Sequence, residues 1–422
     1  MNKYMAYLWG VFLKQVAVCG VLTLIAGHAL SHNPATTKRS VPLSEQTQRA
    51  IVFPDTARYK TLVIDLHTHS VFSDGHVWPN IRVAEAQKDG LDGLAITEHL
   101  EWQPHRQDIL HLDRNRAFEV ALDVATGSDL LVIRGSEITR TMPVGHINAV
   151  FITDANELLF PGHAEFAKDD PQTFRSSAIE WPAQKVLDAA FKQGAFLFWN
   201  HPYWLRQSST GKAKLTDFHI ANIKTNKLHG IEIANGKTYS EEAFQIALDH
   251  DLTLIGTSDV HNLIDWDYDL DQGGHRPVTL VFASDRSTEG VRNALFAGRT
   301  VVWFGNQLLG REEFIQPLLR ASLSVGHLEY LKGTQVAEIT FINVSDVNFH
   351  LRYEGEYTFM WSANRITVPA NSSLTVQVKP GERLDPLTLS FSIENALTAP
   401  NTHARMVFDV FQKPLPKQDS QE

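Results

Sequence analysis

Residues 62–75 have the sequence LVIDLHTHSVFSDG, in which an apolar run is followed by two histidines and an aspartate. The apolar run is typical of a strand buried in a sheet. In an extended segment alternate side chains point to the same side, so His67 and His69 can bind one ion together. Asp74 precedes a glycine, a pair that also favours an ordinary tight turn. The stretch is therefore either the first part of a metal site or a strand that ends in a polar turn.

Residues 61–305 alternate short apolar runs with segments of helical pattern. The apolar runs include TLVIDL, LDGLAIT, AFLFWN, LTLIGT and RPVTLVFA. We expect helices over residues 79–88, 106–125, 182–192, 240–249 and 288–297. This alternation predicts an α/β fold with a parallel sheet, either a barrel or a doubly wound sheet, and helices outside it. The continuous apolar character of the strands indicates burial on both faces.

The sequence pattern changes near residue 320. From there to residue 412, polar and apolar residues alternate between Gly, Pro and Asn turns. This pattern predicts a small all-β sandwich domain. We expect an α/β domain over residues 61–310, the sandwich over 320–412, and a disordered tail over 413–422. The sandwich is expected to serve packing or oligomerisation; glycan binding would need exposed aromatic side chains, and Tyr353, Tyr357 and Trp361 can equally be core residues.

The first 30 residues are predicted to be a secretory signal. Lys3 and Lys14 precede the apolar run 16–25, and the small residues Gly27 and Ala29 follow it. The alternative is an uncleaved membrane anchor, because residues 4–29 approach the length of a ~20-residue span. Residues 31–60 would be a linker and lead-in. We expect an exported, periplasmic protein, in contact with a membrane only if the segment is retained. Cys19 is the only cysteine, so the cleaved chain would have no thiol chemistry.

The composition argues against a polyanion-binding surface. The 422-residue chain has a formal net charge of −10, and its Lys and Arg residues are scattered. We therefore expect no nucleic-acid surface. The expected partner is a small-molecule substrate, and the oligomeric state is not indicated. The chain has 19 histidines against 38 Lys and Arg residues, a high ratio that favours a metal site because histidine is the commonest metal ligand.

Ionisable residues follow the C-terminal ends of most of the expected strands. The loops at that end of an α/β fold converge on one face, so residues distant in sequence can meet there. His146 is the exception, because it begins its strand. Imidazole and carboxylate ligands without cysteine suit Mn, Fe or Zn. The residues at strand ends are His67, His69, Glu98, His99, Glu137, His201, Asp259 and His261.

The motifs DLHTHSVFSDG, LAITEH, GSEIT, GHINAVF, WNHP and SDVH occur in this order over residues 61–305. As an ordered set they resemble the polymerase and histidinol phosphatase (PHP) domain family of metal-dependent phosphoesterases. The resemblance implies a distorted seven-stranded β/α barrel with two to three divalent metal ions at its C-terminal mouth. It also implies that a phosphate ester, in a phosphorylated small molecule, is attacked by a metal-bridging hydroxide.

The resemblance further implies how nine ligands are divided among three ions. Aspartate at position 74 replaces histidine, a known kind of variation there that can change which metal is bound. The first ion would take His67, His69, Asp259 and a bridging Glu137; the second Glu137, His146 and His201; the third Asp74, His99 and His261.

Other polar and aromatic residues are candidates for substrate contact. Arg206 and Arg140 follow the motifs WNHP and GSEIT, where a guanidinium could bind phosphate. Tyr203 and Trp204 could stack on a base or sugar, as could Trp199, which can equally be a core residue. His261 or metal-bound water could protonate the leaving alkoxide. Glu98 could orient a ligand imidazole.

Two other functions stay open at this point. The same metal site would suit an amide, ester or carbamate hydrolase, because a metal hydroxide also attacks carbonyl carbon. A non-catalytic binding module stabilised by metal is the third possibility.

Overall fold

The computed structural model describes residues 51–109, 111–164, 170–360 and 362–413. The predicted signal or anchor, with Cys19, lies outside the described residues, as do Trp361 and all but the first residue of the predicted tail. Within the described ranges, no helix is both long enough and apolar enough to span a membrane.

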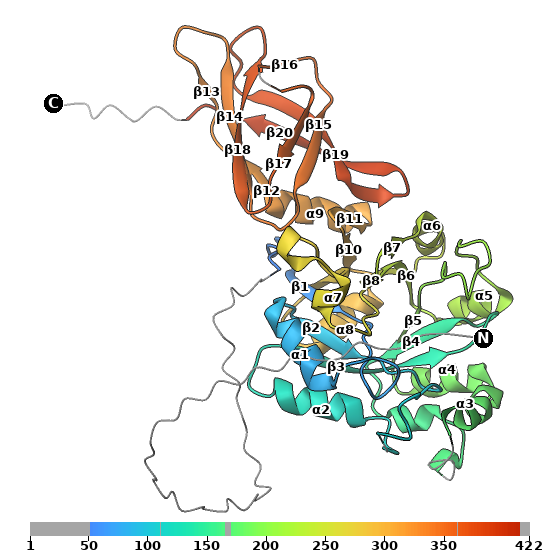
Figure 1. Cartoon of the computed structure of the whole chain (residues 1–422). Helices are drawn as coiled ribbons and strands as arrows, with labels where there is room; N and C mark the ends of the chain where they lie inside the picture. The colour runs from blue at the N-terminus through green and yellow to red at the C-terminus, as the bar shows by residue number, and fades with distance from the viewer. Residues whose placement is uncertain (1–50, 110, 165–169, 361, 414–422) are drawn as a thin grey trace, which may run out of the picture. The chain divides into compact units, whose positions relative to one another are not determined.

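In the described part of the chain, seven strands surround the barrel core (Figure 1). The segments after β1 and β8 meet at the mouth, where the backbone N–H of His69 donates to the carbonyl of Val260. The expected barrel is therefore confirmed over the doubly wound alternative. The strands are β1 (Lys60–Asp65), β2 (Gly93–Ile96), β3 (Leu131–Thr139), β4 (His146–Val150), β5 (Phe196–Trp199), β6 (Gly230–Asn235) and β8 (Thr253–Thr257).

The direction of β4 differs from the expected parallel sheet. It runs antiparallel to both β3 and β5. By contrast, β1, β2 and β3 are parallel to one another, and so are β5, β6 and β8. A parallel crossover needs about a dozen or more residues, and only residues 140–145 join β3 to β4. Gly145 in this turn has φ +73°, and a Cβ there would lie 2.4 Å from Gln207 Oε1. The tight turn makes β4 antiparallel and brings its first residue to the mouth.

Helices cover the outside of the barrel (Figure 1). The helix expected over residues 106–125 begins only at Arg116. The others near 79–88, 182–192, 240–249 and 288–297 are confirmed to within one or two residues. The elements are α1 (Pro79–Lys88), α2 (Arg116–Ala125), α3 (Pro171–Glu180), α4 (Ala183–Lys192), α5 (Asp217–Lys224), α6 (Glu241–Asp249), α7 (Ile264–Asp267) and α8 (Thr288–Phe296), with the short β7 (Thr238–Tyr239) after β6.

The C-terminal region is a sandwich of two antiparallel sheets. The rings of Phe391 and Phe408 each pack edge-on against Phe341 at 5.6 Å, and Tyr353 is buried beside Phe391. Tyr353 is thus a core residue. One sheet has β12 (Leu323–Val325), β13 (Glu329–Tyr330), β14 (Ala337–Asn343), β16 (Thr358–Phe359) and β18 (Ser372–Lys379); the other has β15 (Phe349–Tyr353), β17 (Arg365–Val368), β19 (Leu387–Ala399) and β20 (Thr402–Val410).

Hydrogen bonds between strands connect the barrel to the sandwich. β9 (Val278–Ala283) pairs antiparallel with β1, and β10 (Thr300–Phe304) and β11 (Gln307–Gly310) extend that sheet. β11 then pairs in parallel with β19, with Leu308 opposite Ala396. Helix α9 (Glu312–Ser322) lies between β11 and β12 in the chain. The expected domain boundaries stay predictions.

A buried ion-pair network supports the end of β1, directly before the histidines. Arg276 Nη1 lies 3.2 Å from Asp65 and its Nη2 lies 2.8 Å from Asp89. Asp65 also accepts hydrogen bonds from the hydroxyl (2.6 Å) and backbone N–H (3.1 Å) of Ser258. Burial raises the pKa of Asp65, and these donors oppose that effect. The network holds the ends of β1 and β8 together, and with them the segments that carry His67 and Asp259.

Candidate metal centre

The residues predicted as metal ligands lie together at the mouth of the barrel. Each approaches at least one other member within 4 Å through an imidazole nitrogen or carboxylate oxygen. His146 belongs to this cluster because β4 is antiparallel, so its N-terminal end lies where the parallel strands have their C-terminal ends. The cluster contains His67, His69, Asp74, His99, Glu137, His146, His201, Asp259 and His261.

The first group of ligand atoms comes from His67, His69 and Asp259. The two Nε2 atoms are 3.0 Å apart, and Asp259 Oδ1 lies 3.2 Å from one and 3.1 Å from the other. Two nitrogens that bind one ion at right angles, each about 2.1 Å from it, are about 3.0 Å apart. The spacing therefore fits one shared ion, as the His-x-His pattern predicts.

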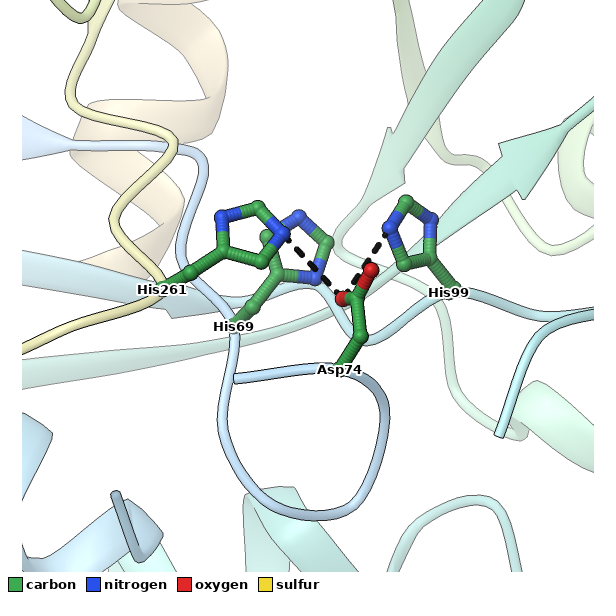
Figure 2. Close-up of side chains that lie close together, drawn as sticks. All are labelled: His69, Asp74, His99 and His261. Atoms are coloured by element: carbon green, nitrogen blue, oxygen red, sulfur yellow. Dashed lines mark ion pairs between the residues drawn. The ribbon is translucent and has the colours of Figure 1, made fainter. Parts of the chain in front are cut away.

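The second group surrounds Asp74 (Figure 2). Asp74 Oδ1 lies 3.2 Å from His99 Nε2 and 3.1 Å from His261 Nε2, and His69 completes the group. Figure 2 shows the rings of His99 and His261 on opposite sides of the carboxylate. The predicted set of Asp74, His99 and His261 is thus brought together, with His69 placed between this group and the first.

Glu137 lies at the centre of the third group. His146 Nδ1 lies 2.9 Å from its Oε1, and His99 Nδ1 lies 2.6 Å from its Oε2. Burial opposes ionisation, but the imidazoles of His99, His146 and His67 hold the pKa of Glu137 well below its usual range. The predicted partner His201 is farther away, with Nε2 3.5 Å from Glu137 Oε1 and 3.7 Å from Asp259 Oδ2. How the ligands divide among ions stays a prediction.

Two carboxylate oxygens provide a test of whether cations fit this cluster. Asp74 Oδ1 and Glu137 Oε2 are buried, and neither has a hydrogen-bond partner among the described residues. Imidazole nitrogens lie close to both, but their N–H groups are not aligned for a hydrogen bond. A buried acceptor without a partner costs about 1–3 kcal/mol, and more when charged. Divalent ions would satisfy these oxygens, so the residues present fit a metal centre.

Glu232 supports the first group from behind and was not predicted. It is fully buried on β6, and its Oε1 accepts from His67 Nδ1 (2.8 Å) and the Thr257 hydroxyl (2.6 Å). Its Oε2 accepts from the backbone N–H of His201 (2.7 Å) and from Asn235 Nδ2 (2.9 Å). The bond to Glu232 places the proton of His67 on Nδ1, which leaves Nε2 free to bind a cation.

We expect Glu232→Gln to weaken metal binding about 10- to 100-fold, because outer carboxylates that orient a ligand histidine have effects of this size. Competition with a fluorescent chelator would measure the dissociation constants. Glu289 is exposed on α8 and belongs to none of the ligand groups, so Glu289→Gln makes the same chemical change and should bind metal like the unaltered protein. Unchanged affinity in Glu232→Gln would show that packing alone orients His67.

Glu98 orients His69 rather than its sequence neighbour His99. The hydroxyls of Ser70 and Ser73 both donate to its buried carboxylate, and His69 Nδ1 is 3.2 Å from the Ser73 hydroxyl. Glu98 therefore acts on His69 through Ser73. His99 is held instead by Thr139, whose hydroxyl lies 2.6 Å from His99 Nδ1.

Comparison with known proteins places the chain in a family. No curated protein matches it. A family model described as an Ig-like domain matches residues 323–409. A solved two-domain protein from Bacteroides vulgatus, described as containing a predicted PHP-like metal-dependent phosphoesterase, is 36% identical, covers 87% of this chain and 100% of its own, and has a TM-score of 0.77. The chain belongs to this PHP-like family.

Two further solved structures have lower sequence identity to this PHP-like protein and match a smaller part of it. One is a putative metal-dependent phosphoesterase from Bifidobacterium adolescentis, with 20% identity over 47% of this chain and 87% of its own, and a TM-score of 0.34. The other is an amidohydrolase from Chromobacterium violaceum, with 18% identity over 47% of this chain and 87% of its own, and a TM-score of 0.31.

A cavity of about 850 Å³ opens onto the metal centre of the PHP-like domain. Six of the predicted ligands line it: Asp74, His99, His146, His201, Asp259 and His261. The predicted contact residues Arg140, Tyr203, Trp204 and Arg206 line it as well. The cavity therefore places six of the nine candidate ligands and the candidate substrate contacts on the walls of one space.

The remaining wall of the cavity includes residues that sequence reasoning missed or left open. Trp102 and Arg175 line it and were not predicted. Trp102 follows His99 by three residues in a loop beyond β2, but no motif includes it. Trp199 is a fully buried core residue whose ring stacks on His219 at 3.9 Å. Trp199 is therefore not among the residues that line the cavity.

Proposed function

We propose that this PHP-like protein is a phosphoesterase that hydrolyses a phosphate ester at the mouth of its barrel. The observation that carries the proposal is the set of three overlapping groups of imidazole and carboxylate atoms, beside a cavity large enough for a small organic molecule. Divalent ions bound there would lower the pKa of water and neutralise the charge that builds up on phosphoryl oxygens.

The residues of the chain have separate parts in this reaction. Glu137 and Asp259 hold negative charge, because nearby imidazoles keep the pKa of each carboxyl below its usual range against the effect of burial. They can therefore bind cations at neutral pH. Arg206 lies on the cavity wall, where its guanidinium can bind a phosphate oxygen. Cationic walls favour an anionic phosphate ester over a neutral amide or ester.

Two roles were predicted for His261, and the geometry supports the ligand role. Its Nδ1 donates to the carbonyl of Asp259 at 2.8 Å, and its Nε2 faces Asp74 at 3.1 Å. Both nitrogens are thus engaged, which leaves no proton for a leaving alkoxide while Nε2 binds an ion. Arg140 is also engaged, by an ion pair of 2.8 Å with Glu101. We therefore do not assign proton transfer to His261, and the phosphate contact expected of Arg140 stays a prediction.

The test is a substrate panel with the full chain, stripped of metal by a chelator and reloaded separately with Mn, Fe or Zn. We expect at least one reloaded form to hydrolyse p-nitrophenyl phosphate or its bis ester, and the stripped form to be inactive. The His67→Ala variant, with its fold checked by circular dichroism, should also be inactive. Turnover of p-nitrophenyl acetate without turnover of either phosphate would favour an ester or amide hydrolase. Metal binding without any turnover would favour a binding module.

Export to the periplasm is proposed from the first 30 residues alone. The amino-terminal sequence of the protein recovered from a periplasmic extract would test both export and cleavage.

A further inference from the structure

Two arginines on the cavity wall have no acidic partner among the described residues. They are Arg175 on α3 and Arg206 after β5. Each guanidinium instead lies over a tryptophan ring, Arg175 over Trp102 at 5.3 Å and Arg206 over Trp204 at 5.1 Å. Guanidinium groups stay cationic at all working pH values. The cavity thus has two arginine–tryptophan pairs whose positive charge no described carboxylate neutralises.

The two pairs differ in their relation to the metal centre. The Trp204 ring is 5.6 Å from His146 and 5.3 Å from His201, centroid to centroid. Arg206 and Trp204 are therefore next to ligand histidines, where the phosphate to be cleaved would bind. Among the described ring contacts, that of Trp102 is with Arg175 rather than with a ligand histidine. The Trp102–Arg175 pair thus differs from the Trp204–Arg206 pair in having no ring contact with a ligand histidine among the described residues.

Arg140 holds this second pair in place. It forms an ion pair of 2.8 Å with Glu101, the residue next to Trp102, and donates at 2.6 Å to the carbonyl of Ile179, one turn after Arg175 on α3. Glu101 is fully buried and accepts a hydrogen bond of 2.7 Å from the backbone N–H of Thr139. A site held by such contacts before the ligand arrives loses little entropy on binding.

The guanidinium of Arg175 also has unused capacity to donate hydrogen bonds. Its Nε is shielded from solvent and has no hydrogen-bond partner among the described residues. A carboxylate or phosphate can accept two parallel hydrogen bonds from one guanidinium. Trp102 lines the same cavity, and its ring adds an apolar surface for the carbon skeleton of a ligand.

We propose that Arg175 and Trp102 form a second anion-binding subsite, which recognises a carboxylate or phosphate on the part of the substrate that is not cleaved. This rests on the proposed function, in which the metal centre binds the phosphate that is cleaved. The cavity, at about 850 Å³, has room for more than a phosphate group. The substrate class is then an organic phosphate with a second anionic group, rather than a simple alkyl or aryl phosphate.

The test measures binding of phosphonates, which cannot be hydrolysed, to the metal-loaded full chain by calorimetry. Phenylphosphonate is compared with its 4-carboxy, 4-carboxymethyl and 4-(2-carboxyethyl) derivatives, which extend the carboxylate stepwise. We expect at least one derivative to bind about tenfold or more tightly than phenylphosphonate. A gain of this size is what one additional charge-assisted hydrogen bond would contribute to the affinity. Arg175→Gln should abolish this preference and leave the affinity for phenylphosphonate within about twofold.

Two further variants keep the inference falsifiable. Arg175→Lys keeps the positive charge but cannot donate two parallel hydrogen bonds, so it should retain part of the preference for the carboxylated derivatives. Arg206→Gln should weaken all the phosphonates alike, because it acts on the group that they share. Equal binding of every derivative by the unaltered protein, or an unchanged preference in Arg175→Gln, would overturn the inference. Absence of phosphate-ester turnover together with an intact preference would overturn only the proposed function.

Discussion

Glu137→Gln is expected to reduce the hydrolysis of phosphate esters on the order of 10³-fold. Its Oε2 lies 2.6 Å from His99 Nδ1, and its Oε1 lies 2.9 Å from His146 Nδ1. Asn200 Nδ2 also donates to Oε1 at 3.0 Å. An amide has no negative charge and only one acceptor oxygen, so it cannot bridge two cations. Metal-ion stabilisation of a transition state is worth several kcal/mol, and each 1.4 kcal/mol is a factor of ten in rate. The measurements are kcat/KM and bound metal per chain by mass spectrometry.

A matched control separates this effect from a general one. Glu313 is exposed on α9, so Glu313→Gln makes the same chemical change far along the chain from the mouth and should leave both quantities unaltered. If Glu137→Gln kept its metal content and lost less than about tenfold in kcat/KM, the carboxylate would not bridge ions. Circular dichroism must show that the variant is folded.

The cluster at the strand ends could be predicted, because the loops after the C-terminal ends of the strands converge on one face in a barrel and in a doubly wound sheet alike. His67, His69 and Asp259 lie within a few residues of the ends of apolar runs, and the structure brings their ligand atoms within 3.2 Å of one another. His146 did not follow this rule under the assumption of a parallel sheet. The short connection at residues 140–145 was the signal that β4 must be antiparallel.

Residues that act through tertiary contacts had no comparable signal. Glu232 lies in GIEIAN, a run that reads only as a buried strand. Its role arises because β6 lies between β5 and β8, so that its carboxylate reaches His67, Thr257 and the backbone of His201. Periodicity indicates that such a residue is buried but not which side chains from other strands will meet it.

The connection between barrel and sandwich was also beyond prediction. Each region was recognised from its own pattern of apolar residues, and both were confirmed. The pairing of Leu308 with Ala396 joins segments far apart in sequence, and such pairing depends on register and on the position of neighbouring strands. Turn residues fix register in a hairpin, but no turn joins β11 to β19.

Asp74→Asn is expected to remove one metal equivalent and to leave the others bound. Asp74 Oδ1 meets His99 and His261, whereas the first group uses His67, His69 and Asp259. An asparagine keeps the shape of the turn but loses the negative charge that a hard cation requires. Turnover should fall on the order of 10²-fold, because one of the positive charges that stabilise the phosphoryl oxygens is lost. Metal per chain and kcat are measured on the same sample.

The exposed Asp129→Asn is the control, since it changes the same group outside the cluster. The result also tests the position of His69, which belongs both to the group around Asp74 and to the group with His67. If His69 binds chiefly with His67, the first ion survives the loss of Asp74. Loss of all metal from Asp74→Asn would contradict this division, because it would mean that the two groups bind their ions cooperatively through His69 and that no ion is held independently.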